Sequence, residues 1–330
     1  MANKTNKKRP SRPAAERGKS SSRGRKGGRP GGQAPRAVVH KATAADWIAA
    51  ARIRTLPVAI APVALGTAAA YVASEEAHWV RALLCLVVAV FLQIGVNYAN
   101  DYSDGVRGTD RHRVGPARLT ASGAAKPRTV LTVALLFFLL AALAGLALVV
   151  ASGQYWLLAV GVACVAAAWF YTGGKHPYGY YGLGEVFVFV FFGLVATAGT
   201  TYVQVGSVTL ESWLAGAATG FLACAVLVVN NLRDLEQDAI ARKRTLAVLA
   251  GATVARVLYC LFLGIPFLIL GFFSLFYVNA PLVYFALLLA VPAGLITVTG
   301  KTSGEFLLAL KLTSLTVLVF GLGLAAAIAF

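Results

Sequence analysis

Charged residues are scarce in this 330-residue chain, in which 58% of the residues are hydrophobic and only 13% are charged. Soluble domains are usually nearer half apolar and a quarter charged. The apolar residues also occur in long uninterrupted runs, and about 20 consecutive apolar residues suffice for a helix to cross a bilayer. The composition therefore argues against a soluble domain and predicts an all-α polytopic membrane protein.

Cysteine and histidine are rare as well, with four residues of each. Every cysteine lies inside an apolar run, and the sequence contains neither a Cys-x-x-Cys pair nor a Cys/His cluster. The sequence therefore indicates neither a disulfide framework nor a zinc site. The cysteines are most simply small buried hydrophobic residues.

Much of the net charge of +17 comes from residues 1–41, which hold 13 of the 30 Lys and Arg residues and only one acid, Glu16. This segment is rich in Gly, Ser and Pro, so we expect a disordered cytoplasmic tail. It has no apolar stretch beside its basic one and is not a secretory signal peptide. A solvated tail that fixes topology is the simplest interpretation. Attraction to anionic lipid headgroups and loose nucleic-acid binding are alternatives, and no specific nucleic-acid partner is expected.

The remaining residues, 42–330, form the predicted transmembrane domain. Nine runs are long enough to span, near 55–74, 79–99, 129–151, 153–172, 184–204, 212–232, 253–276, 279–299 and 306–329. If the tail is cytoplasmic, the loops 104–128 and 233–244 are cytoplasmic too, and they carry six and four Lys or Arg residues. The opposite loops near 75–78, 205–211 and 277–278 carry none. The positive-inside rule therefore supports both the count and the orientation.

Acids are scarce, and six of the thirteen fall in the segments 97–110 and 230–238. Both segments follow even-numbered predicted spans, so both are expected on the cytoplasmic side. Helical residues three or four apart share a face, which predicts two polar stripes. The stripes are Asn97, Asp101 and Asp104, and Asn230, Asp234 and Asp238. Each begins Asn-x-x-x-Asp, four spans apart, which suggests a parallel internal repeat.

Two carboxylate stripes pack together only if positive charge lies between them. Oxygen ligands without His or Cys suit a hard cation, Mg²⁺ or Ca²⁺, and Mg²⁺ typically joins carboxylates to substrate phosphates. The nearby cations that could neutralise the remaining phosphate charge are Arg113, Arg118, Lys175, Arg233, Lys243 and Arg244. The alternative is that the acids merely pair with loop arginines at the membrane surface.

A membrane-embedded site for Mg²⁺ and a diphosphate predicts a substrate with a long lipid tail, such as a polyprenyl diphosphate. Metal binding promotes departure of the diphosphate and leaves an allylic carbocation. The surrounding apolar spans are expected to accept the tail and to exclude water.

At these residues the sequence resembles the UbiA superfamily of intramembrane prenyltransferases. The two Asp-rich motifs of that superfamily appear here as NDYSD (100–104) and DLEQD (234–238), and the match extends over nearly all of 48–330. Four further stretches are similar to the branch that prenylates 1,4-dihydroxy-2-naphthoate, at 52–66, 108–123, 171–193 and 230–251. The chain departs from the family at Ile53, where Pro is usual, at Arg242, where Gly is usual, and at the pair Lys175–His176.

The resemblance implies a bundle of about nine helices in the bacterial plasma membrane, with an active-site cavity on the cytoplasmic side. It implies transfer of a polyprenyl group from polyprenyl diphosphate to 1,4-dihydroxy-2-naphthoate, with loss of CO₂ and diphosphate. The product is demethylmenaquinol, which oxidises to demethylmenaquinone in menaquinone biosynthesis. The expected partners are the two substrates and the lipid bilayer, and the sequence indicates no protein partner.

The resemblance also implies roles for individual residues. The catalytic residues are expected to be Asp101, Asp104, Asp234 and Asp238. The expected Mg²⁺ ligands are these four with Asn97, Asn100, Asp110 and Asn230. Diphosphate contacts are assigned to Arg118, Lys175, Arg233 and Lys243, and acceptor contacts to Arg54, Tyr171 and Tyr178. The tyrosines are alternatively interfacial anchors, and Arg54 alternatively extends to the lipid headgroups.

Three other functions compete with this interpretation. A prenyltransferase of the same superfamily that acts on 4-hydroxybenzoate or homogentisate shares every metal residue. A CDP-alcohol phosphatidyltransferase fits DYSDG (101–105) superficially, but the rest of its motif is absent. A transporter is expected to place its ionisable residues near the bilayer midplane, whereas these acids lie at the ends of predicted spans.

Overall fold

The computed structural model describes residues 41–76, 78–112 and 118–330. All regular elements of these residues are helices, as predicted, and eight are long and apolar enough to cross a membrane. They are α2 (Pro57–Ser74), α3 (Trp79–Arg107), α4 (Pro127–Ser152), the run of α6 (Gly184–Val188), η4 (Phe189–Val195) and α7 (Ala196–Val205), α8 (Leu210–Arg233), α10 (Leu246–Phe276), the run of η5 (Ala280–Ala286) and α11 (Leu287–Thr299), and α12 (Ser303–Ala329). The predicted basic tail, except Lys41, lies outside the described residues.

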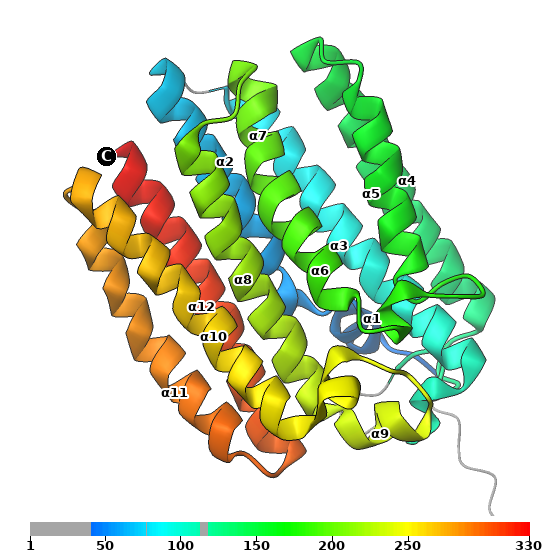
Figure 1. Ribbon diagram of the computed structural model, residues 1–330. Helices are drawn as coiled ribbons and strands as arrows, with labels where there is room; N and C mark the ends of the chain where they lie inside the picture. The colour runs from blue at the N-terminus through cyan, green and yellow to red at the C-terminus, as the bar shows by residue number, and fades with distance from the viewer. Residues whose placement is uncertain (1–40, 77, 113–117) are drawn as a thin grey trace, which may run out of the picture. The chain divides into compact units, whose positions relative to one another are not determined.

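The fourth predicted span, 153–172, is a shorter helix. Helix α5 (Leu157–Phe170) has 14 residues, which corresponds to about 21 Å at 1.5 Å per residue, less than a typical hydrocarbon core of about 30 Å. It follows α4 after a tight turn at Gly153, whose φ of 71° is left-handed. Within α5 only Ala168 is buried. Helices α4 and α5 form one edge of the bundle, and α11 lies at the opposite edge (Figure 1).

Helices α2 and α8 are the most buried spans, and small residues explain their close packing. A Cβ atom on Gly66 of α2 would lie 2.3 Å from the carbonyl oxygen of Thr197 in α7. A Cβ atom on Gly193 in η4, a π-helical segment, would lie 2.5 Å from the carbonyl oxygen of Gly216 in α8. Small residues allow helix backbones to approach closely in membranes, where burial from water contributes little to association.

Buried hydroxyl groups add hydrogen bonds between the same helices. Thr201 of α7 donates to the carbonyl oxygen of Gly66 in α2 at 2.8 Å, and Ser212 of α8 donates to Thr201 at 2.8 Å. In the other half of the bundle the hydroxyls of Tyr259 in α10 and Thr313 in α12 lie 2.7 Å apart. These hydrogen bonds help to hold neighbouring helices together, because the hydroxyl groups have no water to bond to within the hydrocarbon region.

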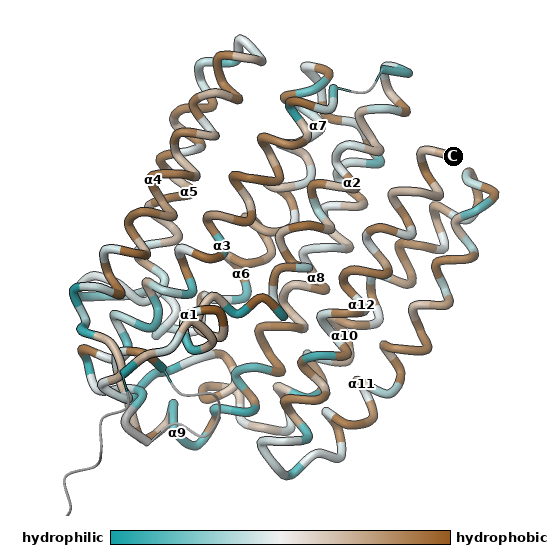
Figure 2. Tube along the Cα trace, turned by 180° about the vertical axis from the view of Figure 1, so that it is seen from behind, coloured by the Kyte–Doolittle hydropathy of each residue, from teal (hydrophilic) through white to brown (hydrophobic). Residues whose placement is uncertain are grey.

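The C-terminal ends of α3 and α8 lie at the same end of the bundle. The short helices α1 (Ala44–Ala50) and α9 (Leu235–Ile240) are at this end too, and hydrophilic residues gather there (Figure 2). The two acidic motifs are therefore on one side of the membrane domain, as their even separation of four predicted spans implies.

Candidate active site

The first acidic motif extends helix α3 beyond its apolar part. The helix remains regular up to Arg107 and ends at Gly108, whose φ of 76° is the left-handed conformation of a helix C-cap. Asp104 is 1% exposed, and its Oδ1 accepts a hydrogen bond from the Tyr180 hydroxyl at 2.8 Å. Asp110 follows in η2 (Thr109–His112), where its carboxylate lies 3.3 Å from Nε of Arg118.

The second acidic motif lies where α8 ends and α9 begins. Asp234 is the residue between the two helices, and Asp238 is a buried residue of α9. Arg233 donates to both oxygens of Asp234, from Nε at 2.8 Å and from Nη2 at 2.7 Å. Arg233, a predicted diphosphate contact, thus forms an ion pair with the next residue in sequence, Asp234, a predicted metal ligand.

Lys243 joins the two motifs, and Arg118 adds a second cation to the first motif. The Lys243 ammonium lies 3.5 Å from Oδ2 of Asp104 and 3.8 Å from Oδ1 of Asp238. Arg118 reaches Asp104 as well, with 3.9 Å between Nη2 and Oδ2. Burial by itself lowers the pKa of Lys243, but the charges of Asp104 and Asp238 outweigh it, so that the pKa is raised and the ammonium stays charged. The positive charge that the two stripes require is supplied here by these side chains.

Tyr180 and Arg107, which the sequence analysis did not single out as ligands, organise this end of the bundle. The Tyr180 ring has Arg107 Cζ and Lys243 Nζ each 5.4 Å from its centroid. Arg107 donates to the carbonyl oxygens of Thr172 and Gly174 and so holds the 171–180 loop over the site. Burial and the Asp104 charge raise the pKa of Tyr180 to about 12, so its hydroxyl remains a hydrogen-bond donor. For Tyr180, the sequence signal was the similarity of the stretch 171–193 to the family.

The donor set fits Mg²⁺ bound together with a phosphate group. No three His, Cys, Asp or Glu side chains of the described residues form a group that could hold a metal ion by themselves. Mg²⁺ commonly uses only one or two carboxylates and completes its shell with waters and substrate phosphates. Within the same part of the chain, Nη1 of Arg118 and of Arg233 is buried without a hydrogen-bond partner. Buried guanidinium donors beside carboxylates are what a metal-bound anion requires.

The other predicted ligands have different surroundings. The Asn97 amide donates to the carbonyl oxygen of Ala51 at 2.9 Å, and the Asn100 side-chain oxygen accepts from the Thr172 hydroxyl at 2.7 Å. Asn230 lines a cavity beside the motifs. Lys175 is exposed.

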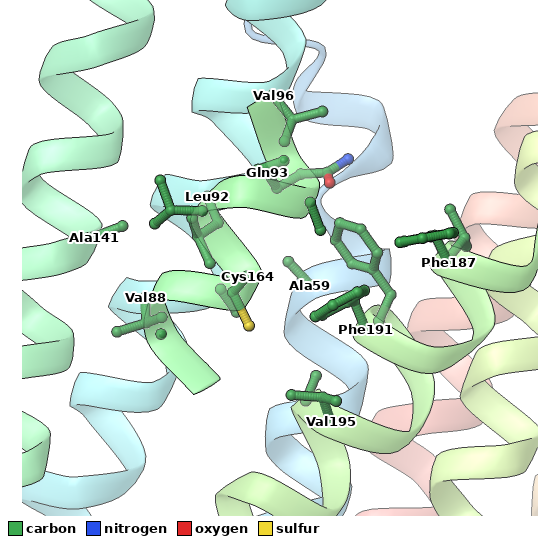
Figure 3. A pocket seen from close by; sticks show the side chains of 18 of the residues that line it. Ala59, Val88, Leu92, Gln93, Val96, Ala141, Cys164, Phe187, Phe191 and Val195 are labelled. Atoms are coloured by element: carbon green, nitrogen blue, oxygen red, sulfur yellow. The ribbon is translucent and has the colours of Figure 1, made fainter. Parts of the chain in front are cut away.

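A cavity of about 780 Å³ extends from the acidic end into the membrane domain. Its wall runs along α3 from Asn100 to Cys85, which is about 22 Å of helix. Aliphatic and aromatic side chains form most of the wall, and Leu92, Phe187 and Phe191 are among those that surround the space (Figure 3). Helix α5 contributes much of one side.

The predicted acceptor residues Tyr171 and Tyr178 both line this cavity. The Tyr178 ring stacks on Phe187 with 3.9 Å between centroids, and its hydroxyl donates to the carbonyl oxygen of Ala167. From the segment before α2, Arg52 rather than Arg54 lines the cavity, and its φ of 54° is left-handed. The sequence carried no sign of this backbone conformation.

The chain is similar to known proteins over most of its length. The model of the UbiA prenyltransferase family matches residues 59–305. The chain is 49% identical over 302 residues to a 1,4-dihydroxy-2-naphthoate octaprenyltransferase of Mycobacterium tuberculosis, covering 88% of this chain and 98% of that protein. It is 38% identical over 239 residues to the Escherichia coli protein of the same name, covering 70% and 76%.

Solved structures show the same fold at low sequence identity. A UbiA homolog from Archaeoglobus fulgidus bound to GPP and Mg²⁺ superposes with a TM-score of 0.59 at 15% identity, covering 85% of this chain and 99% of that one. The apo structure of a UbiA homolog from Aeropyrum pernix K1 gives 0.63 at 15% identity, covering 81% and 97%.

Proposed function

The chain belongs to the UbiA prenyltransferase family, and we propose that it transfers a polyprenyl group from polyprenyl diphosphate to 1,4-dihydroxy-2-naphthoate. CO₂ and diphosphate leave, and the product is demethylmenaquinol, which oxidises to demethylmenaquinone in menaquinone biosynthesis. The relatives named for this reaction support the acceptor. The observation that carries the proposal is the meeting of two acidic motifs and buried cations beside a long apolar cavity, which Asn100 and Asn230 of the motif segments line.

The charged groups beside this end of the cavity bind the diphosphate. Asp104, Asp110, Asp234 and Asp238 would hold Mg²⁺, with Asn100 and Asn230 as further oxygen donors. When bound, Mg²⁺ neutralises charge on the departing diphosphate. The free N–H groups of Arg118 and Arg233 and the ammonium of Lys243 donate to phosphate oxygens, and the exposed Lys175 is a further diphosphate contact.

The apolar end of the cavity binds the polyprenyl tail. Its wall presents few polar atoms along about 22 Å of α3, so the tail is held away from water. Helix α5 lines the cavity, and Ala168 is its only buried residue. A tail longer than the cavity therefore continues into the bilayer beside α5.

The reaction takes place between these two ends. The C–O bond of the prenyl diphosphate breaks with its electron pair going to diphosphate, and the ring carbon that bears the carboxylate bonds to the allylic carbon. The C–CO₂ bond then breaks and its electrons restore the aromatic ring. The ring faces of Tyr171, Tyr178 and Phe187 stabilise the allylic cation, and the apolar wall keeps water from it.

We also propose that the acidic end faces the cytoplasm of a bacterial plasma membrane. Arg107, Arg118, Lys243 and other basic residues gather at this end, whereas the predicted loops at the opposite end carry no Lys or Arg. Accessibility labelling of single cysteines at Lys175 and at Gly206 in sealed vesicles tests the orientation, since the two sites lie at opposite ends of the bundle.

The reaction is tested with purified protein in detergent, a polyprenyl diphosphate, Mg²⁺, and either 1,4-dihydroxy-2-naphthoate or 4-hydroxybenzoate, with products analysed by mass spectrometry. We expect a decarboxylated, prenylated naphthalene product that disappears with EDTA. Asp238→Asn should lower the rate about 100-fold or more, whereas Glu236→Gln, an exposed acid on the same helix, should not. Product from 4-hydroxybenzoate alone would overturn the acceptor assignment.

A further inference from the structure

Asp101 differs from the other motif acids in what its carboxylate contacts. Its Oδ2 accepts a hydrogen bond from the backbone N–H of Leu119, and its Oδ1 accepts one from the backbone N–H of Thr120, both at 2.9 Å. The residue is 1% exposed. Among the described residues, no Lys, Arg or His forms an ion pair with Asp101, unlike Asp104 or Asp238. Both of its oxygens are directed to a neighbouring loop.

Asp101 belongs to a stripe of α3 that anchors neighbouring segments. Residues four apart share a helix face, and Gln93, Asn97 and Asp101 follow this spacing. The Gln93 amide donates to the Thr55 hydroxyl at 3.2 Å, and the Asn97 amide donates to the carbonyl oxygen of Ala51. Asn100 and Asp104 form the adjacent stripe, which meets the 171–180 loop and the cations. Within the motif Asn-Asp-x-x-Asp, Asp101 therefore contacts one neighbouring segment, whereas Asn100 and Asp104 contact another.

The loop that Asp101 holds is pressed against the same helix. A Cβ atom on Gly105 would lie 2.5 Å from the Thr120 side chain, so a larger residue there would displace the loop. Leu119 is 2% exposed, and its carbonyl oxygen accepts the N–H of Ala125. Glycine at 105 and the carboxylate of Asp101 thus fix the backbone of 119–120 from two points.

Arg118 is the residue directly before this anchored backbone. Its carbonyl oxygen accepts the Ser122 hydroxyl at 2.6 Å. Its guanidinium reaches Asp110 at 3.3 Å and Asp104 at 3.9 Å, and its Nη1 is buried with no partner among the described residues. The position of this donor depends on the backbone that Asp101 holds.

We propose that Asp101 is a positioning residue, which acts on diphosphate binding through Arg118 and is not itself a metal ligand. This inference rests on the proposed function, because it assumes that the site binds a metal-bound diphosphate. Asparagine at 101 keeps the size but replaces one accepting oxygen with an NH₂ group that faces a backbone N–H. The loop then loses one charge-assisted hydrogen bond and gains a donor–donor contact.

Direct binding separates the two roles. Isothermal titration of Mg²⁺-saturated protein with inorganic pyrophosphate should show affinity about tenfold or more weaker for Asp101→Asn than for the original protein. In an Arg118→Ala background, the same substitution should cause little further loss, because its effect passes through Arg118. Additive losses in the two backgrounds would overturn the inference.

Metal binding provides the second measurement. Mn²⁺ binding followed by electron paramagnetic resonance should be unchanged by Asp101→Asn and weakened by Asp104→Asn. Equal weakening by both would show that Asp101 is a ligand. Ser103→Ala, a buried position on the same helix, is the matched control and should change neither affinity. If Asp101→Asn fails to fold, Asp101→Glu, which keeps the charge and both oxygens but misplaces them, is read by the same two criteria. Absence of pyrophosphate binding by the original protein would overturn the proposed function itself.

Discussion

Substitution of Lys243 by methionine should destabilise the protein in the absence of Mg²⁺ and make it unusually responsive to Mg²⁺. The ammonium lies 3.5 Å from Asp104 and 3.8 Å from Asp238, so it forms an ion pair with each of the two motifs. At an effective dielectric constant of about 20, each such contact corresponds to about 4–5 kcal/mol of attraction. Much of this is offset by desolvation of the lysine.

The net loss of stability is set by the two buried carboxylates that remain when the Lys243 ammonium is removed. Loss of one partner from a buried ion pair costs about 3–5 kcal/mol, because the remaining charge is left uncompensated. The Lys243 side chain is 12% exposed, so we expect a value near the lower end, about 3 kcal/mol. Methionine keeps a similar apolar length, so that lost packing contributes little.

The assay is thermal unfolding of the purified protein in detergent, with and without Mg²⁺. Lys243→Met should unfold at a lower temperature than the original protein, and Mg²⁺ should recover most of the difference by compensating the same carboxylates. Lys175→Met, which removes an exposed lysine at the same end of the bundle, should behave like the original protein. An equal Mg²⁺ response in all three proteins would refute the reasoning.

The difference in stability between the original protein and Lys243→Met should depend on pH in one direction. The folded pKa of Lys243 is raised above its unfolded value, which is about 10.4. The stabilisation by the Lys243 charge is therefore complete below the pKa of the unfolded protein and is lost as the pH rises through the pKa of the folded protein. The stability difference between the original protein and Lys243→Met should be constant from neutral pH to about pH 9 and shrink at higher pH.

Other predictions concern the backbone, the packing and the cavity. Arg242→Gly should stabilise the protein by up to about 1 kcal/mol, because Arg242 has a left-handed φ of 56°, and denaturant unfolding should show no such gain for Arg244→Gly. Gly193→Val should cost at least about 1–3 kcal/mol, because its side chain would meet backbone atoms of α8. Gly199→Ala, where no atom lies within 4 Å of the new Cβ, should show no loss in the same thermal assay. Cys164→Trp should lower kcat/KM for a long polyprenyl diphosphate about tenfold, as its ring would fill cavity space, while leaving pyrophosphate affinity unchanged; a loss of both would contradict a tail-binding role.

The departures from the family pattern show where sequence and structure inform each other. Glycine is usual where Arg242 stands, and the structure supplies the reason, since this position needs a left-handed backbone after α9. At Ile53 no comparable reason emerges from the structure. The resemblance assigns an acceptor contact to Arg54, whereas the structure brings a neighbouring arginine to the cavity wall. The left-handed turn at Arg52 redirects the chain before α2, so that Arg52 lines the cavity.

The amino-acid sequence by itself determined that this protein is a helical membrane protein with two acidic motifs on one side. Long apolar runs can satisfy their backbone groups in lipid only as helices, and the parity of the spans places both motifs at one end. These conclusions depend on the composition of each segment and on the order of the segments along the chain, both of which can be read without knowing how the helices pack.

The partner of each motif residue was decided only by the tertiary structure. Asp101 and Asp104 are three residues apart on one helix, yet one meets the backbone of Leu119 and the other meets Tyr180 and Lys243. Helical spacing predicts one shared polar stripe for them but carries no information about which segment packs against each side chain. That assignment follows from close contacts between segments distant in sequence, such as the contact of Gly105 with Thr120, and such contacts exist only in the folded chain.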